Sequence, residues 1–167
     1  MATLHFKEIT TATPEQFVTA LTDFGPGRSK VFGNSADDYL EVRDRGATEA
    51  DVTESSGGIW ERLRYDWTDP DVVSMKTIDS NVWGGASGHT YIFTRKSDGT
   101  TRVDAYVVRE GKNLKGRLLA IVLGSVGKPV LARAFANTVK AIETQNEARR
   151  ILSKDRTALP KSGAVAA

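Results

Sequence analysis

The chain has 167 residues, 40% of them hydrophobic and 26% charged, and a formal net charge of +2 at neutral pH. This length and composition are typical of one soluble domain with a single core, and the interspersed charges do not favour nucleic acid as a partner. The sequence contains no cysteine, which excludes disulfides, thiol catalysis and thiolate metal sites.

Only two histidines, His5 and His89, are present, and no pair of them has a metal-ligand spacing. We therefore expect neither a metal site nor a cofactor. The opening segment, residues 4–9, has no apolar stretch and no cleavage site of the kind that marks secretion. A cytoplasmic protein is the expectation.

The first forty residues predict one strand and two short helices. Alternation over residues 4–10 indicates a strand. Thr13, Pro14 and Gln16 form a capping box with proline at the first helical position, and that helix should end before Gly25. A second helical turn is expected over residues 28–32.

Six strands with a period of two should follow, at residues 39–43, 48–52, 59–67, 71–78, 88–95 and 101–109. Most of their connections are short and rich in Gly, Asp and Ser, so neighbouring strands must be antiparallel. A longer loop is expected over residues 80–87. The segments 55–58 and 80–87 are candidate gates for any enclosed space.

The last hairpin determines its own register. Ser97-Asp98-Gly99 suits a three-residue loop with glycine in the left-handed conformation, which pairs Lys96 with Thr100. Counting back places three residues of one strand opposite three of the other on one apolar face: Phe93, Tyr91 and His89 opposite Val103, Ala105 and Val107. The same alternation turns another set inward: Ile59, Glu61, Leu63, Tyr65 and Trp67.

One long helix is expected from about Leu114 to Arg150. Its apolar stripe moves around the helix by about 100° where Gly124, Gly127 and Pro129 occur, which predicts a bend between about residues 123 and 130. The second half, with Phe135, should close the inner space. The apolar run 118–123 is too short to span a bilayer and should be covered by loops, a second subunit or a membrane surface. Residues 151–167 should be a flexible tail.

This order of elements resembles the helix-grip fold of the START-like superfamily, also called Bet v 1-like or SRPBCC. The resemblance covers about residues 1–150 and is carried by four segments: 60–67, 79–85, 88–93 and 98–100. It implies an α+β fold in which a seven-stranded curved antiparallel sheet, two short helices and a long C-terminal helix enclose a cavity. Members bind lipids, polyketides, isoprenoids or hormones there, and the resemblance implies no particular catalysis.

Inward-facing residues are the candidate ligand contacts. They are Glu61, Leu63, Tyr65, Trp83, His89, Tyr91, Phe93, Val107, Phe135 and Val139. Each also has a purely structural interpretation: core packing for the apolar and aromatic residues, a hydrogen bond to the adjoining loop for His89, and a local twist or bulge that turns Glu61 to solvent. If Glu61 does face inward, it should either form a salt bridge with a residue such as Arg109 or orient a polar group of the ligand.

The sequence leaves three functions to weigh. The leading hypothesis is a non-catalytic binder or carrier of a hydrophobic small molecule. The second is a cyclase- or dehydratase-type enzyme that uses His89 with Glu61 or a tyrosine for general acid–base chemistry. The third is a regulatory interaction module. The expected partner is a small hydrophobic ligand, and nucleic acid is not an expected partner. For the apolar half-helix the options are a homodimer or a transient membrane contact, and stable membrane insertion is not expected.

Overall fold

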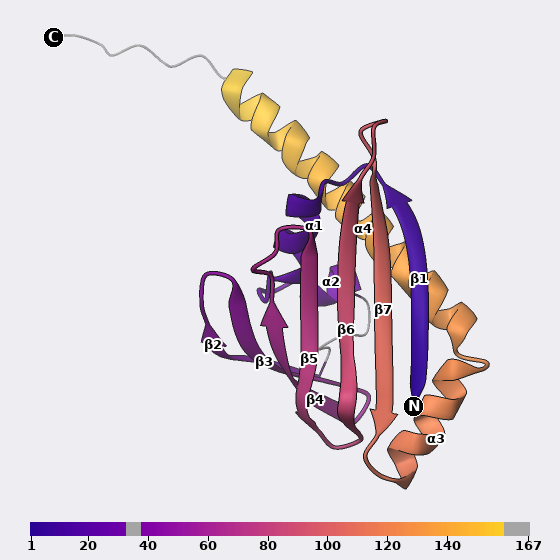
Figure 1. Ribbon diagram of the computed structural model, residues 1–167. Coiled ribbons are helices and arrows are strands. Elements are labelled where there is room, and N and C mark those ends of the chain that lie inside the picture. The colour runs from indigo at the N-terminus through magenta and orange to yellow at the C-terminus, as the bar shows by residue number, and fades with distance from the viewer. Residues whose placement is uncertain (33–37, 159–167) are drawn as a thin grey trace, which may run out of the picture.

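The computed structural model describes residues 1–32 and 38–158, in which the chain forms seven strands and four helices (Figure 1). The strands are β1 (Ala2–Thr10), β2 (Tyr39–Arg45), β3 (Glu49–Ser56), β4 (Ile59–Asp66), β5 (Val72–Ser80), β6 (Trp83–Arg95) and β7 (Thr101–Gly111). The helices are α1 (Pro14–Leu21), α2 (Arg28–Phe32), α3 (Leu114–Gly124) and α4 (Lys128–Ala158). The predicted α+β helix-grip architecture is confirmed.

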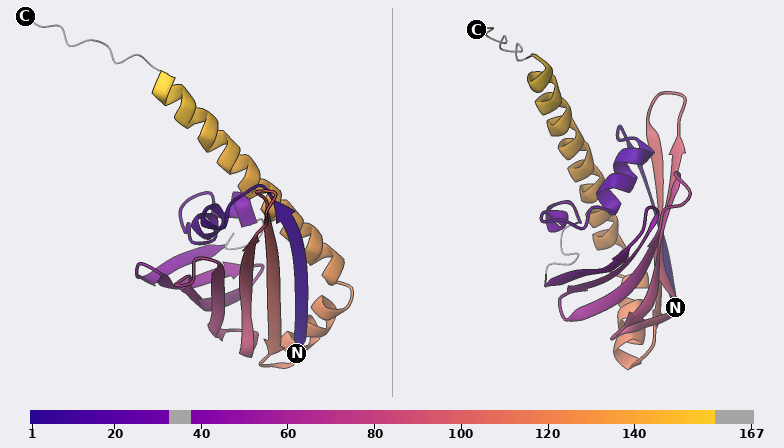
Figure 2. Two further views of the ribbon diagram at one scale, coloured as in Figure 1. Left: turned by 45° about the horizontal axis from the view of Figure 1, so that its top comes forward. Right: turned by 90° about the vertical axis from the view of Figure 1, so that its left-hand side faces the viewer.

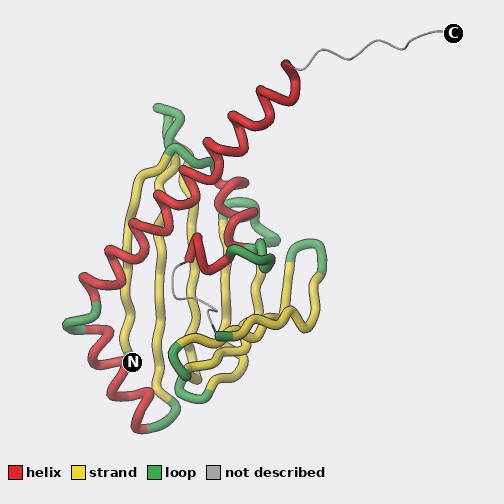
Figure 3. Tube along the Cα trace, turned by 180° about the vertical axis from the view of Figure 1, so that it is seen from behind, coloured by secondary structure: helices red, strands yellow, loops and turns green. Residues whose placement is uncertain are grey.

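All strands belong to one antiparallel sheet of order β1-β7-β6-β5-β4-β3-β2. Each strand pairs with its neighbour in the chain, except that β1 returns to the edge of β7. The sheet is strongly curved, and α4 crosses its concave side (Figure 2). Seen from behind, α4 and α2 lie on the same side of the sheet (Figure 3).

The hydrophobic core fills the space between the concave face, α1 and the middle of α4. Its fully buried members include Phe17, Val52, Val73, Val103 and Ile142. The predicted capping box holds the start of α1, since Thr13 and Gln16 accept each other's backbone N–H groups. Burial of the apolar alternate positions is what fixes the orientation of each strand.

The predicted register of the last hairpin is confirmed. Lys96 N–H donates to the Thr100 carbonyl across 2.8 Å, and Gly99 has a φ of +82°. As a result His89 lies opposite Val107, and Phe93 opposite Val103. The inner face of β6 and β7 is therefore the one that the alternation predicts.

The loop predicted over residues 80–87 was wrong. Only Asn81 and Val82 separate β5 from β6, and β6 already begins at Trp83. The Gly-rich segment that suggested a loop is a bulged strand whose register shifts between Gly84 and Gly88. Glycine permits this because Gly85 has a φ of +55°, and because a Cβ on Gly88 would lie 2.5 Å from the Met75 carbonyl oxygen.

The C-terminal segment is two helices, and the predicted bend is confirmed. The axes of α3 and α4 differ by 76° across the break between Gly124 and Lys128. The predicted boundary of the flexible tail differs from the structure, because α4 continues to Ala158, and residues 159–167 lie outside the described part. The expectation that loops cover residues 118–123 is not met, because Leu118 and Ile121 are exposed among the described residues.

Helix α3 is held against the sheet by a contact that only glycine permits. A Cβ on Gly116 would lie 2.1 Å from the Val82 carbonyl oxygen, and one on Gly111 would lie 2.1 Å from the Arg117 nitrogen. The N-cap residue Asn113 accepts the Gly116 N–H at 2.9 Å, which fixes the start of the helix. The helix backbone thus lies directly on the end of β7.

We predict that Gly116→Ala destabilises the protein by about 2 kcal/mol, although alanine is the better helix former. The reason is that the backbone of Val82 must move to admit a methyl group. Chemical denaturation measures this free energy of unfolding. The matched control is Gly124→Ala, where the nearest atom is the Ala2 Cβ at 3.3 Å. Equal stability of the two variants would contradict the close contact.

Candidate functional site

A cavity of about 470 Å³ lies between the concave face of the sheet and α4. Most of the predicted contact residues line it: Glu61, Leu63, Tyr65, Trp83, His89, Tyr91, Val107 and Phe135. Further apolar wall comes from residues of β1, β5, β7, α3 and α4, among them Phe6, Met75, Ala105, Leu123 and Leu131. The site is therefore built by all layers of the fold.

Two of the predicted contacts do not line this cavity. Phe93 packs its ring 5.5 Å from that of Phe17, and Val139 is buried in the same hydrophobic cluster. Both lie on the predicted inward faces, but toward the end where α1 fills the space between helix and sheet. They are core residues.

Two glutamates face each other on the cavity wall. Glu54 of β3 and Glu61 of β4 are direct partners in the antiparallel register and both line the cavity. Like charges at opposed positions are destabilising unless each is neutralised. Each carboxylate has its own arginine, Arg28 for Glu54 and Arg109 for Glu61.

Arg28 is buried and organises the first pair. Its guanidinium donates to the Tyr65 hydroxyl at 2.8 Å, and that hydroxyl donates to Glu54 Oε1 at 2.7 Å. Arg28 also donates to the Leu21 and Asp23 carbonyls and lies over the Phe24 and Phe32 rings. Burial raises the pKa of Tyr65 well above its ordinary value, and the nearby Glu54 charge adds to this.

The second pair is a network to which four neighbouring strands contribute one residue each. Arg109 of β7 donates to Glu61 Oε1 of β4 at 2.8 Å, and Thr77 of β5 donates to the same oxygen at 2.9 Å. Arg109 also donates to Nε2 of His89 on β6. In a flat sheet β7 and β4 would be about 14 Å apart, so the curvature brings this pair together.

His89 is held neutral by this network. Because Nε2 accepts the Arg109 proton, the ring carries its own proton on Nδ1. Burial lowers the pKa of His89 well below its ordinary value, and the Arg109 charge lowers it further. The predicted hydrogen bond from His89 to an adjoining loop was wrong, because its partner is a strand residue.

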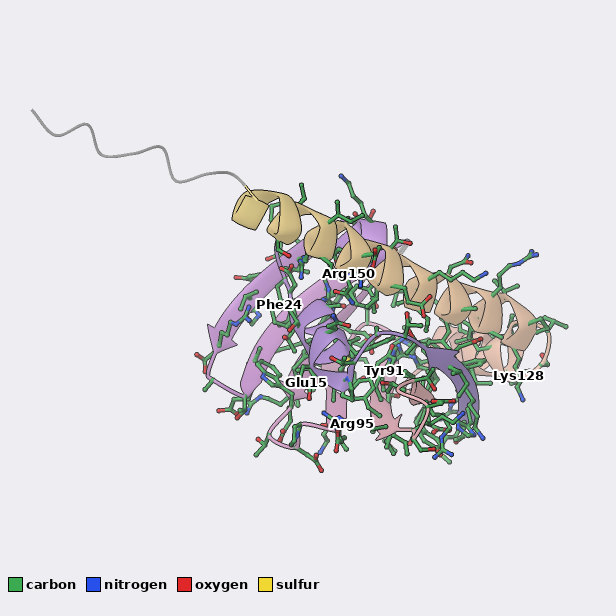
Figure 4. The ribbon with its side chains drawn as sticks, turned by 90° about the horizontal axis from the view of Figure 1, so that it is seen from above. Glu15, Phe24, Tyr91, Arg95, Lys128 and Arg150 are labelled. Carbon is green, nitrogen blue, oxygen red and sulfur yellow. The ribbon has the colours of Figure 1, made fainter. Side chains whose placement is uncertain are left out.

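Tyr91 supplies the remaining polar group of the wall. Burial raises its pKa, and the charges of Arg28, Glu54 and Arg109 all act on it, which places it near both ion pairs. Its hydroxyl has no hydrogen-bond partner in the described part of the chain. Figure 4 shows Tyr91 in the space beneath α4. This hydroxyl is available to a bound molecule.

Sequence reasoning missed Arg28 and Glu54. Glu54 follows Ala50 and Val52 at alternate positions of β3, so its inward direction was readable from the pattern. Arg28 gives no such signal, because a five-residue helix has no periodicity to read. Trp83 was expected in a loop, and instead it is buried under the Arg109 guanidinium, which lies 5.2 Å from its ring.

Comparison with known proteins gives a match in structure and none in sequence. No protein-family model and no curated protein matches the chain. A protein of known structure from Thermus thermophilus superposes with a TM-score of 0.66 at 14% identity, over 86% of this chain and 98% of that chain. A START superfamily protein from Mycobacterium smegmatis gives 0.63 at 10% identity, over 88% and 98%.

The aromatase/cyclase Zhui from Streptomyces sp. R1128 is similar over a longer stretch. Its TM-score is 0.63 at 15% identity, and the match covers 97% of this chain and 98% of that chain. Identities this low establish architecture rather than activity. With the sheet order and the crossing helix already described, they show that this chain has the START-like helix-grip fold.

Proposed function

We propose that the protein binds an uncharged hydrophobic small molecule that carries a hydroxyl or carbonyl group, without converting it. The observation that supports this most directly is a cavity with apolar walls and a small set of ion-paired polar groups at Glu54 and Glu61. Protein interiors are otherwise packed like organic crystals. A void of about 470 Å³ is large for a packing defect and lies within the range of small-molecule sites.

The charge balance of the wall favours a neutral ligand. Arg28 and Arg109 are matched by Glu54 and Glu61, so no unpaired charge is left to attract an ion. A charged ligand would lose its hydration without gaining a partner. An uncharged molecule needs only one hydrogen bond, and the Tyr91 hydroxyl offers it.

Among lipids, isoprenoids and polyketides, we favour an aromatic polyketide-like molecule. The wall carries several aromatic rings, including those of Phe6, Tyr91, Trp83 and Phe135, which suit flat ring systems. Two structurally similar proteins are an aromatase/cyclase from Streptomyces and a di-domain aromatase/cyclase of steffimycin biosynthesis. These names support the ligand class by analogy of fold.

Cyclisation of such a molecule is the second candidate function, favoured by the names of the same two proteins. The geometry supports binding better. An effective general acid titrates near neutral pH, whereas His89 stays neutral, which makes its remaining Nδ1 proton very weakly acidic, and its Nε2 already accepts from Arg109 and is not free to act as a base. Glu61 is occupied by Arg109 and Thr77. The acid–base pair expected from the sequence is therefore already engaged.

Filling the cavity tests the binding site. We predict that the uncharged dye Nile red binds the wild-type protein and that Val107→Phe weakens binding about tenfold or more, since the added ring occupies the void. A tenfold loss corresponds to about 1.4 kcal/mol. Val108→Phe is the matched control, because Val108 lies on the opposite face of β7. Equal binding by both variants, measured by fluorescence titration, would place the dye elsewhere.

The Tyr91 hydroxyl can be tested with a pair of ligands. We predict that Tyr91→Phe weakens 2-naphthol binding by about two- to tenfold, which is the net worth of one hydrogen bond. Naphthalene binding should not change, because it makes no such bond. The stability of the variant should equal that of the wild type. If both ligands lose affinity equally, as measured by calorimetry, the hydroxyl is not the polar contact.

The neutral state of His89 predicts a pH dependence of stability. Its pKa is lower in the folded protein than in the unfolded chain, so below about pH 6.5 only the unfolded state gains this proton. Stability should therefore fall between about pH 6.5 and about pH 5, by up to about 1.4 kcal/mol per pH unit. Urea denaturation at a series of pH values should show a smaller slope of stability against pH for His89→Gln than for the wild-type protein. An unchanged slope in His89→Gln would refute the assignment.

A further inference from the structure

Helix α3 exposes an apolar face that nothing in the described chain covers. Leu114, Leu118, Ile121 and Val122 are 74%, 56%, 67% and 49% exposed, and we call these four residues the α3 outer face. Val126 and Val130, just beyond the helix, are also exposed. Exposed apolar residues are ordinary when scattered, but a contiguous set marks a contact surface.

The arrangement around the helix is that of an interfacial amphipathic helix. At about 100° per residue, the α3 outer face spans an arc of about 100°, with Lys115 on one flank and Arg117 on the other. The opposite side carries Gly116 and Ala120, which are buried against the sheet. A helix that lies in a membrane surface has this pattern of an apolar face edged by Lys and Arg.

All charges along this part of the chain are positive. Between Glu110 and Glu143 the sequence has no acidic residue and six basic ones: Lys112, Lys115, Arg117, Lys128, Arg133 and Lys140. Lys112 pairs with Asp79, but no described residue forms an ion pair with Lys115, Arg117 or Lys128. Figure 4 places Lys128 at the end of α4 that meets α3.

These charges decide between the candidate occupants. A second copy of the chain would bring the same cations against Lys115 and Arg117, and like-charge juxtaposition opposes association. An anionic lipid surface offers an apolar layer and negative headgroups together. None of the described helices is by itself long and apolar enough to cross a bilayer, and α3 passes a test of length and composition only together with α4, as a pair bent by 76°.

We propose that the α3 outer face docks on an anionic phospholipid membrane, with its apolar side chains among the headgroups and Lys115 and Arg117 on the phosphates. On the inner side of the same helix, Leu123 lines the cavity. Docking would thus leave only helix α3 between the membrane surface and the cavity. The inference does not depend on the proposed ligand, because docking is measured without one.

Vesicle cosedimentation of the full chain tests the proposal. We expect binding to phosphatidylcholine vesicles that contain phosphatidylglycerol, and much weaker binding to phosphatidylcholine alone. Leu118→Gln with Ile121→Gln should lower binding at least about tenfold. Lys115→Gln with Arg117→Gln should lower it about fivefold per cation removed. Added salt should weaken the wild type more than the charge variant.

Matched controls carry the same changes away from α3. Ile9→Gln with Ile78→Gln replaces two exposed strand residues, and Lys76→Gln removes an exposed cation from β5. These variants should bind as the wild type does. Because every altered side chain is exposed, thermal melts should match, and Nile red titration separates a damaged cavity from failed docking.

Absence of wild-type binding to the anionic vesicles would overturn the proposal. So would α3 variants that bind as well as their controls. Sedimentation velocity gives a third outcome: a dimer that Leu118→Gln and Ile121→Gln dissociate, without vesicle binding, would make a second copy the occupant and refute a lipid one.

Discussion

Two carboxylates opposed across β3 and β4 impose the strongest constraint on this molecule. Glu54 and Glu61 lie on the inner face, where an unpaired charge costs several kcal/mol. The arginines that neutralise them come from distant places, one from α2 and one from β7 across two intervening strands. Both pairs form only if α2 lies over β3 and the sheet curves. The pairing of the buried charges and the curvature of the sheet therefore depend on each other.

The same pairing explains why the space is not simply filled. A wall of apolar residues alone would favour collapse until the side chains touch, because each buried CH₂ contributes about 0.8 kcal/mol. Ion pairs resist this, since their geometry depends on fixed partners such as Tyr65 and Thr77. The ion-paired groups thus hold the apolar walls apart, and an uncharged ligand meets a wall whose charges are already paired.

Local features of this chain could be predicted from sequence, and long-range ones could be predicted only in part. The β6–β7 register followed from one loop and strict alternation, and the bend after α3 followed from a shift of the apolar stripe. The strand at Trp83 was missed because a bulge needs the same glycines as a loop. Most predicted cavity residues lie on the wall, and the salt bridge expected between Glu61 and Arg109 is present, since both residues lie on strand faces that alternation assigns. The Arg28–Glu54 pair, 26 positions apart, was missed because the short helix α2 has no periodicity to read.

The sheet order has a consequence for how the chain folds. Strands β2 to β7 each pair with a chain neighbour, whereas β1 pairs with β7 about a hundred residues later. Contacts between near residues form quickly, and contacts that close long loops form slowly. On the ribosome, β1 must wait as an unpaired strand until β7 emerges, and α4 emerges only after β7. The interior is therefore open to solvent, and to any molecule present, until α4 has been made and packs on the sheet.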